Sequence, residues 1–449
     1  MLADLLRFSD RRIPRYTSYP TAVQFVAAVD GPTYAEWLAA LPDDVAVSIY
    51  LHVPFCAELC LFCGCHTTVV RKYTPVAAYA DLLEREIALV GRHLGGRRPV
   101  RHVHWGGGTP TMLLPGDFAR LTDVLRRIFS IARDCEIAVE IDPRTLTRDM
   151  VCALKDGGVT RASLGVQDFD PRVQKAVRRE QNFEQTSRTA EWLRNAGIAN
   201  INLDLMYGLP YQTVETVADT ARRSLALGAD RIALFGYAHV PWMKRHQKLL
   251  PDEALPGPLE RFAQSKAAAV VLEEAGFQPI GLDHFAKPDD LLARRQRERR
   301  LHRNFQGYTT DESTALIGIG TSAIGVLPQG YVQNASSMAA YRDAIQAGCL
   351  ATVRGRALTE EDRLRRDIIE QLMCNLEVDL ARTAAARNRN LNDFATELSE
   401  IDALAERGLV HRCDGKIAVA EDARPLVRTI CAVFDAYLSN QDTRYSRAV

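Results

Sequence analysis

The sequence predicts an α/β protein. Its main domain is expected to be a partial (β/α)6 TIM-like barrel, with an N-terminal extension and a mainly helical, winged-helix-like C-terminal domain. Apolar segments rich in β-branched residues alternate with segments of helical periodicity six times over about 230 residues. Strands that alternate with helices form parallel sheets with right-handed crossovers. No clear seventh or eighth repeat of this type follows, so we expect the barrel to be incomplete.

The six repeats give six strands and six helices. In the first helix, Thr74 is expected to be the N-cap and Pro75 the first residue, and apolar residues recur at helical spacing from Tyr79 to Leu94. The expected strands are 46–53, 100–105, 136–141, 160–166, 201–206 and 231–237. The expected helices are 75–94, 118–129, 148–155, 183–196, 214–227 and 258–275.

The domain boundaries follow changes in this pattern. Residues 1–44 contain one short periodic segment near 34–41 and are expected to extend over the active site. Residues 45–350 are expected to form the barrel with its following elements, and residues 351–449 a separate helical domain.

Helices and one small hairpin are predicted in the C-terminal domain. Thr359 and Asp362 resemble a capping box, and Asp414-Gly415 separates two short strands as in a β-hairpin. Helices are expected near 391–405 and from Arg424. Winged helices often bind DNA, but a fold does not determine a function. Because this segment has no dense basic patch, we expect it to cover or support the barrel.

The composition excludes several classes of partner. Lys+Arg and Asp+Glu both number 56, so the net charge is zero and nothing indicates nucleic acid or an anionic membrane. The first twenty residues resemble no signal peptide, and no apolar run approaches the roughly 20 residues of a membrane span. We therefore expect a cytoplasmic protein. No heptad pattern indicates obligate assembly, so a monomer is expected.

One basic stretch, residues 291–303, allows more than one interpretation. It contains six arginines. Such a stretch is most often a solvated helix face. The alternatives are a docking site for an acidic electron donor and a binding site for a polycarboxylate substrate.

The most informative feature is the cysteine loop 56–65. Cys56, Cys60 and Cys63 have the spacing C-x3-C-x2-C, and Cys65 follows. Three thiolates can ligate three irons of a cubane iron–sulfur cluster, which leaves the fourth iron free to bind a small molecule. The alternatives are ligation by all four cysteines and a zinc site. Zinc usually takes two separated cysteine pairs, and no distant second pair is present. The other six cysteines are scattered and are expected to be mostly buried small apolar residues.

Further polar and glycine residues follow the ends of the predicted strands, where parallel βα folds form their sites. The run 106–108 follows the second strand, Glu140 ends the third, and Asp204 lies late in the fifth. Glycines let a ligand approach the backbone closely. Glu140 and Asp204 could accept hydrogen bonds from an ammonium group or ribose hydroxyls, and Arg179 could bind a carboxylate.

At these residues the chain resembles the radical S-adenosylmethionine superfamily, whose signature is C-x3-C-x2-C with an aromatic residue before the last cysteine. Within it, the chain is most similar to the oxygen-independent coproporphyrinogen III oxidases. This resemblance covers nearly the whole chain. The segments that carry it are PRYTSYPT (14–21), YLHVPFC (50–56), CGC (63–65), HWGGGTPT (104–111), EIDPR (140–144), GVQDFD (165–170), NLDLMYGLP (202–210), YAHVP (237–241), LHRNFQGYTT (301–310) and RRDIIEQLMCN (365–375).

The resemblance implies a [4Fe–4S] cluster and two S-adenosylmethionine molecules. It assigns the cluster to Cys56, Cys60 and Cys63, with Cys65 as a non-ligand. The residues that match the binding site of the first S-adenosylmethionine are Tyr50, Gly107, Glu140 and Ile324. Those that match the second site are Phe62, Gly108, Thr109, Gln167, Arg179, Asp204 and Ala238. Candidates for contacts with substrate are Arg15, Tyr16 and 302–303.

The resemblance also implies the reaction. A 5′-deoxyadenosyl radical would abstract hydrogen from two propionate groups of coproporphyrinogen III, whose oxidative decarboxylation to vinyl groups gives protoporphyrinogen IX in anaerobic haem biosynthesis. An external low-potential donor, flavodoxin-like or ferredoxin-like, would supply the electron. The alternatives are a related radical enzyme or haem-handling paralogue without decarboxylase activity, a non-catalytic electron carrier and a zinc scaffold.

Overall fold

The computed structural model describes residues 8, 11–438, 445 and 446. Its centre is a twelve-stranded mixed sheet with the strand order β16-β15-β14-β13-β1-β4-β5-β6-β7-β8-β10-β9. The six predicted strands lie next to one another in parallel and in chain order. They are β1 (Val47–Val53), β4 (Pro99–Gly107), β5 (Ser130–Ile141), β6 (Arg161–Gln167), β7 (Asn200–Tyr207) and β8 (Arg231–Gly236).

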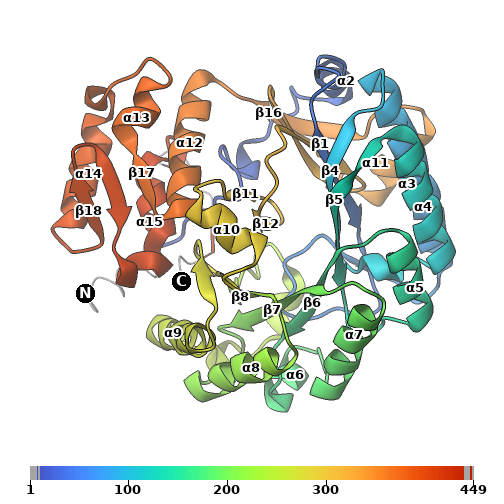
Figure 1. Ribbon diagram of the computed structural model, residues 1–449, viewed down its shortest axis with the longest axis horizontal. Coiled ribbons are helices and arrows are strands. Elements are labelled where there is room, and N and C mark those ends of the chain that lie inside the picture. Colours follow the sequence, from blue (N-terminus) through green and yellow to red (C-terminus); the bar gives the residue numbers. More distant parts are fainter. Residues whose placement is uncertain (1–7, 9–10, 439–444, 447–449) are drawn as a thin grey trace.

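The helices that connect these strands cover the outer face of the sheet (Figure 1). They are α3 (Thr74–Leu94), α4 (Pro115–Ile128), α5 (Arg148–Asp156), α6 (Pro171–Ala176), α7 (Phe183–Asn195), α8 (Val214–Ala226) and α9 (Pro258–Glu274). All six predicted helices are present, and α6 was not expected. The prediction that Thr74 is the N-cap of α3 was wrong. The N-cap is Tyr73, and Thr74 is the first residue of the helix.

The sheet continues beyond the six repeats on both sides but does not close. β13 (Ala315–Ile319) pairs in parallel with β1, and β10 (His284–Ala286) pairs antiparallel with β8. Antiparallel strands complete the two edges: β9 (Gln278–Ile280), β14 (Ile324–Leu327), β15 (Gly330–Asn334) and β16 (Thr352–Ala357). Among the described residues, β9 and β16 are not paired with each other, which confirms the partial barrel.

Alternation along the central strands separates a polar inner face from an apolar outer face. Trp105, Val139 and Leu205 are buried in the core between the sheet and its helices. Their neighbours in the strands, including His104, Glu140 and Asp204, line cavities on the inner face. The inner face of the sheet therefore carries the polar side chains that could bind a ligand or take part in catalysis.

The C-terminal domain consists of helices and a three-stranded antiparallel sheet, in which β18 and β19 form the predicted hairpin and β17 was not expected. The helices are α12 (Glu360–Asn375), α13 (Leu380–Ala385), α14 (Ala395–Ala405) and α15 (Val427–Cys431), and the strands are β17 (Glu377–Asp379), β18 (Val410–Cys413) and β19 (Lys416–Val419). Thr359 forms the expected capping box with Asp362. Asp414 and Gly415 both have positive φ, as a tight hairpin turn requires.

The N-terminal segment joins the C-terminal domain to the sheet. Ile13, Tyr16 and Tyr19 belong to the core of the C-terminal domain, and Tyr16 donates to Asp435 at 3.0 Å. Val26 bridges to Gly355 at the edge strand β16, before α2 (Gly31–Ala39). The boundaries proposed at 44/45 and 350/351 remain predictions.

The remaining elements are short and lie in the loops: β2 (Phe55–Cys56), β3 (Thr68–Val69), α10 (Leu291–Arg297), β11 (His302–Asn304), β12 (Gly307–Thr309) and α11 (Met338–Gln346). No helix within the described residues combines the length and apolar character that a membrane span requires.

One buried carboxylate ties α3 to the strands beyond β1. Glu86 is 1% exposed. It accepts hydrogen bonds from Asn334 Nδ2 at 2.6 Å, Gly320 N at 2.7 Å and Tyr341 Oη at 2.5 Å. Burial raises its pKa to about 7 despite these donors. The Glu86 side chain is therefore expected to stabilise the fold. Its three hydrogen-bond partners lie outside the cysteine loop.

Replacing Glu86 with alanine is expected to lower the free energy of unfolding by about 1–3 kcal/mol, because Asn334 Nδ2, Gly320 N and Tyr341 Oη would lose their buried acceptor. Chemical denaturation measures the change. The exposed Glu36→Ala serves as the control and should alter stability little. An equal loss in both variants would show that the Glu86 hydrogen bonds do not stabilise the fold.

Candidate active site

The cysteine loop lies at the carboxyl end of β1. Its backbone is fixed by hydrogen bonds from Leu61 N to Val177 O at 2.9 Å and from Thr68 N to Pro54 O at 2.6 Å. Cys60 is buried, whereas Cys56 and Cys63 are half-buried and Cys65 is exposed. The loop thus brings the three cysteines of the C-x3-C-x2-C motif to the inner face of the sheet.

Polar groups from three other segments approach two of these sulfur atoms. Thr109 Oγ1 donates to Cys56 Sγ at 3.6 Å. Arg179 Nη1 and Arg144 Nη2 lie 3.5 and 3.6 Å from Cys60 Sγ. Donors of this kind stabilise thiolates, and hydrogen bonds to cluster sulfurs help to set the reduction potential of iron–sulfur proteins. The surroundings of these sulfurs therefore suit ligated thiolates.

The two arginines are themselves held by a carboxylate. Asp142 accepts from Arg144 Nη2 at 2.7 Å and from Arg179 Nη1 at 3.2 Å. Burial disfavours the ionised form of Asp142, but the two guanidinium groups lower its pKa below the usual value. Arg144 was not selected from the sequence, although it belongs to the EIDPR segment and lies only two residues after Asp142.

The thiols themselves differ in acidity. Burial raises the pKa of Cys56 to about 11. Hydrogen bonding with Cys65 lowers the pKa of Cys63 to about 6 and raises that of Cys65 well above its usual value. Among the described residues, no three His, Cys, Asp or Glu side chains lie close enough together to bind a single metal ion. A cubane cluster makes no such demand, because each thiolate binds a different iron.

The loop is also held from its outer side by a segment that sequence analysis missed. This segment, residues 241–249, follows β8. Lys244 Nζ donates to Cys65 O at 2.7 Å, and His246 Nε2 lies 2.8 Å from Cys63 O. Gln247 Nε2 donates to Phe62 O at 3.0 Å and to Ala238 O at 3.2 Å. Ala238 is thereby linked to the cysteine loop through Gln247.

The glycine run at the end of β4 is packed against this site. A Cβ atom on Gly106 would lie 2.7 Å from Glu140 Oε1 and 3.0 Å from Tyr50 Cε2. One on Gly108 would lie 2.7 Å from Phe55 O and 3.0 Å from Cys56 Sγ. Only glycine leaves room for these approaches of Glu140, Tyr50, Phe55 and Cys56, and the expected approach of a ligand to this run remains a prediction.

Two buried carboxylates on the inner face have opposite electrostatics. Burial would raise the pKa of Glu140, but hydrogen bonds from His104 Nε2 at 3.0 Å and Gly107 N at 3.1 Å lower it below its usual value. Burial and the nearby Glu140 raise the pKa of Asp204 to about 6, although Ser163 donates to it at 2.9 Å. Both carboxylates retain acceptor capacity.

A cavity of about 180 Å³ brings most of the predicted residues together. The predicted site residues that line it are Cys56, Cys60, Phe62, Cys63, Gly107, Gly108, Thr109, Glu140, Gln167, Arg179 and Asp204. Gln167 has a φ of 70°, and its buried Oε1 has no hydrogen-bond partner among the described residues. An orphaned acceptor in a polar cavity indicates space for a ligand with donors.

Three predicted residues lie beside this cavity rather than in its lining. Tyr50 donates to or accepts from His52 Nδ1 at 2.9 Å and adjoins Gly106. Ile324, at the start of β14, lies against Gly318 of β13, which is paired with Tyr50. Ala238 is the third. The structure therefore places Tyr50 on β1 and Ile324 on β14, with β13 between them, whereas Ala238 follows β8 and is linked to Phe62 through Gln247.

Two further cavities continue from this one. The second, of about 300 Å³, shares Cys65, Glu140, Ser163 and Asp204 with the first. Arg161 and Arg231 line it and are 8% and 6% exposed, and each has side-chain nitrogens without a partner among the described residues. The third cavity, of about 490 Å³, is lined by Tyr16, His302 and Arg303, and its walls meet those of the second at Asn304, Thr309, Asp311 and Leu316.

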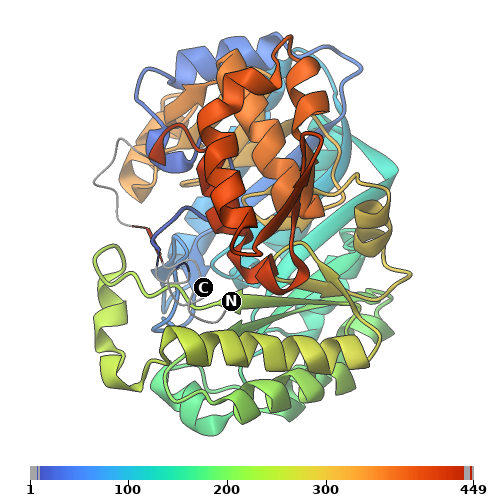
Figure 2. The same ribbon diagram turned by 90° about the vertical axis from the view of Figure 1, so that its left-hand side faces the viewer.

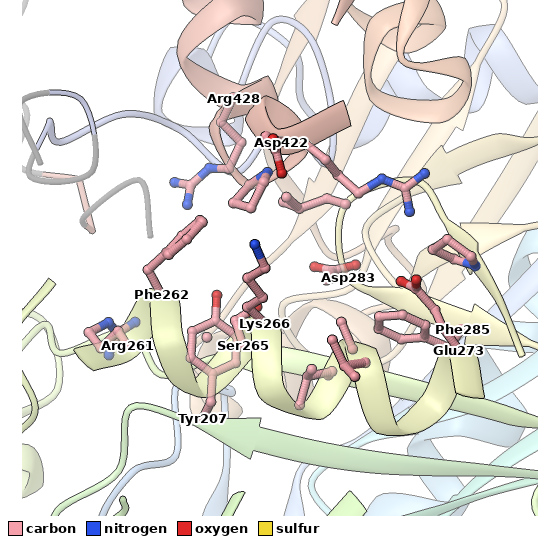
Figure 3. Close-up of a pocket in the computed structure, with 18 of the residues that line it drawn as sticks. Tyr207, Arg261, Phe262, Ser265, Lys266, Glu273, Asp283, Phe285, Asp422 and Arg428 are labelled. Carbon is pink, nitrogen blue, oxygen red and sulfur yellow. The ribbon is translucent and has the colours of Figure 1, made fainter. Parts of the chain in front are cut away.

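A separate groove of about 280 Å³ lies between α9 and the C-terminal domain. Figure 3 shows Phe262 and Lys266 rising from α9 toward Asp422 and Arg428. Tyr207, Leu234 and Phe285 line it. Along their strands these residues lie an odd number of positions from Asp204, Ala233 and His284, which are paired across the sheet, so they point to the opposite face. The groove therefore lies on the outer face of the sheet. Arg15 lines this groove, whereas Arg303 lines both the groove and the 490 Å³ cavity.

Two family models and several named proteins match this chain. Residues 50–223 match the family described as Radical SAM superfamily, and residues 358–426 match the HemN C-terminal domain. The chain is 52% identical over its full length to the full-length oxygen-independent coproporphyrinogen III oxidase of Bradyrhizobium diazoefficiens. It is 41% identical to the Salmonella typhimurium protein of that name, over 95% of this chain and 93% of the relative.

A solved structure gives the same picture. The coproporphyrinogen III oxidase HemN from Escherichia coli, described as a radical SAM enzyme, superposes with a TM-score of 0.90 at 39% identity. The match covers 95% of this chain and 100% of the other.

Gly108→Ala is expected to abolish most iron binding, because its Cβ would displace the backbone of Pro54 and Phe55 and the sulfur of Cys56. Iron and sulfide analysis of anaerobically purified protein measures the loss. Gly116→Ala is the matched control, since nothing lies within 4 Å of its Cβ position. Full iron content in Gly108→Ala would contradict the tight packing of the loop against β4.

Asp204→Asn is expected to raise the free energy of unfolding at pH 8 by up to about 3 kcal/mol and to change it little at pH 4. With a pKa of about 6 against 3.8, native Asp204 keeps a proton that the unfolded chain has released, so its contribution to stability falls as the pH rises through this range. Asparagine has no such loss.

Chemical denaturation of anaerobic protein at both pH values measures the difference, with the exposed Asp219→Asn as control. A variant less stable than the parent at pH 8 would show that ionised Asp204 stabilises the fold.

Proposed function

The chain belongs to the oxygen-independent coproporphyrinogen III oxidase family, within the radical S-adenosylmethionine superfamily, and we propose that it performs the family's reaction. It is an oxidoreductase that converts two propionate groups of coproporphyrinogen III into vinyl groups and so gives protoporphyrinogen IX. Each conversion removes one hydrogen atom, which the 5′-deoxyadenosyl radical takes up, one carbon dioxide, and one electron, which passes to an electron acceptor. The observation that carries this proposal is the cavity in which three cysteine thiols meet the glycine run, Glu140 and Asp204.

Cys56, Cys60 and Cys63 would hold a [4Fe–4S] cluster, and Cys65 would remain free. The donors from Thr109, Arg144 and Arg179 support this assignment, because they suit anionic sulfur. Held there, such a cluster would supply the electron for reductive cleavage of S-adenosylmethionine, the source of the 5′-deoxyadenosyl radical. The protein contributes binding, orientation and the exclusion of water.

The chain's own residues would bind two S-adenosylmethionine molecules. Ionised Glu140 suits an ammonium group, and Gly107 and Gly108, which have no side chains, line the same cavity. Asp204, with its pKa of about 6, is largely ionised at neutral pH and suits ribose hydroxyls. Tyr50 and Ile324 would border the first molecule, whereas Phe62, Thr109, Gln167, Arg179 and Ala238 would border the second.

The linked cavities support a large polycarboxylate substrate. Porphyrinogens are bulky and partly apolar, and the 490 Å³ cavity combines Tyr16, Tyr19, Phe305 and Tyr331 with arginines. Two buried nitrogens of Arg303, Nε and Nη1, have no hydrogen-bond partner among the described residues, so this side chain can donate hydrogen bonds to a carboxylate. Tyr16, His302 and Arg303 are the proposed substrate contacts in this cavity. Arg15, in the outer groove, is a weaker candidate.

The finer features of the proposal concern partners and location. The protein would act in the cytoplasm as a monomer, without nucleic acid or membrane, in anaerobic haem biosynthesis. A flavodoxin-like or ferredoxin-like protein would supply the electron. The alternative is a related radical S-adenosylmethionine paralogue or haem-handling protein that keeps the cluster but does not decarboxylate.

Anaerobic turnover tests the function. Protein, S-adenosylmethionine, dithionite and coproporphyrinogen III are expected to give the divinyl product, identified by its mass, with release of carbon dioxide. Cys60→Ala should lose both the visible absorbance of the cluster and S-adenosylmethionine cleavage, whereas Cys65→Ala should keep its cluster. Cleavage of S-adenosylmethionine without any vinyl product would favour the non-decarboxylating paralogue.

A further inference from the structure

The 241–249 segment exposes an apolar patch next to the cysteine loop. Met243 is 66% exposed, Leu249 61% and Trp242 38%. Figure 2 shows the yellow-green chain before α9 extending from the body of the molecule at the left. Large apolar side chains grouped on a soluble protein mark a contact surface more often than chance exposure does.

The patch and the cysteine loop form one connected unit. Lys244, His246 and Gln247 alternate with the exposed residues of this segment and bind the carbonyls of Cys65, Cys63 and Phe62. The inner side of the loop faces the cavity in which the cofactor and substrate would bind. The 241–249 segment is therefore attached directly to the C-terminal half of the loop and itself faces solvent.

The charge around the patch is mainly positive. Arg245 and Lys248 are exposed within the segment, and the Cζ atom of Arg12 lies 5.2 Å from the centre of the Trp242 ring. Two acidic residues follow, of which Asp252 pairs with His239 at 3.2 Å. A few apolar side chains among basic ones match the small, charge-steered interfaces of transient redox complexes.

The basic stretch 291–303 provides no equivalent surface. Arg295, Arg297 and Arg300 interact with Glu298, Gln278 and Glu312. Asp290, immediately before α10, binds Arg231 at the start of β8, so α10 lies at the opposite end of the strands from the cysteine loop. Its helical part is thus a salt-bridged surface, whereas Arg303 at its end lines the 490 Å³ cavity.

We propose that Trp242, Met243 and Leu249, with Arg12, Arg245 and Lys248, form the docking surface for an acidic one-electron carrier protein that reduces the cluster. This inference rests on the proposed function, since it supposes a cluster at the loop. The carrier approaches the loop from outside while the opposite side holds cofactor and substrate. Electron delivery and substrate binding therefore use different faces of the same ten-residue loop.

The test compares two reductants. In Arg245→Glu/Lys248→Glu, S-adenosylmethionine cleavage driven by reduced flavodoxin is expected to fall at least about tenfold at low ionic strength, because charge reversal opposes an acidic carrier. Cleavage driven by dithionite should be unchanged, since dithionite needs no docking surface. Arg133→Glu/Lys155→Glu makes the same change in net charge at the other end of the strands and should leave both rates unchanged.

Binding gives a readout that does not depend on activity. Calorimetric titration with flavodoxin should show a dissociation constant at least about tenfold larger in Arg245→Glu/Lys248→Glu, and Met243→Glu should weaken binding without abolishing dithionite-driven cleavage. Equal binding by parent and variant would overturn the docking surface. Binding without any cleavage in the parent would contradict the proposed function and leave the surface supported.

Two other outcomes would also reject the proposal. A loss of dithionite-driven cleavage in Arg245→Glu/Lys248→Glu would show that these residues act on the cysteine loop itself. A change in sedimentation mass caused by the same variant would show that the patch pairs two copies of this chain.

Discussion

The thiols of Cys56, Cys60 and Cys63 belong to a loop whose only regular structure is the short β2–β3 pair, so its shape depends on hydrogen bonds from distant segments. From inside the sheet, Thr109, Arg144 and Arg179 reach the sulfur atoms. From outside, residues 244–247 bind the carbonyls. This double attachment lets an irregular loop present three thiols in one fixed arrangement, and the cofactor chemistry depends on that arrangement.

Several polar side chains on the inner face of the sheet destabilise the fold but can bind a ligand. Glu140 is kept ionised by His104 and Gly107, while burial and the nearby Glu140 raise the pKa of Asp204 despite donors from Ser163 and Asn202. Arg161 and Arg231 keep unpaired nitrogens in the next cavity. Unsatisfied polar groups weaken a folded protein unless a ligand completes them. Their concentration along one line of cavities marks the path that cofactor and substrate would share.

Much of the fold could be predicted because its signals are local. The six parallel strands are short apolar runs between helices with regular stripes, and the cysteine spacing is visible within ten residues. β13 to β16 were not predicted from the sequence, because these strands are short, contain glycine and do not belong to the six βα repeats. Their role depends on pairing across the sheet, as when Gly318 meets Tyr50.

The supports of the site were harder to predict than the site itself. Lys244, His246 and Gln247 bind backbone carbonyls of residues that lie about 180 positions earlier in the chain. Every residue has a backbone carbonyl, so no sequence motif could have identified these contacts. Arg144 was within reach, since a basic residue two positions after Asp142 is a natural partner for it. The resemblance to a family predicts ligand positions, whereas only the structure shows which hydrogen bonds hold those residues in place.

The central claim is that the cluster has one iron that no cysteine binds and that S-adenosylmethionine occupies it. Electron paramagnetic resonance of the dithionite-reduced protein, recorded before and after S-adenosylmethionine is added, tests this claim directly. A clear change in the g values is predicted, because the ligand joins the cluster. An unchanged spectrum at saturating S-adenosylmethionine would mean that the protein ligates all four irons, and the account would be wrong.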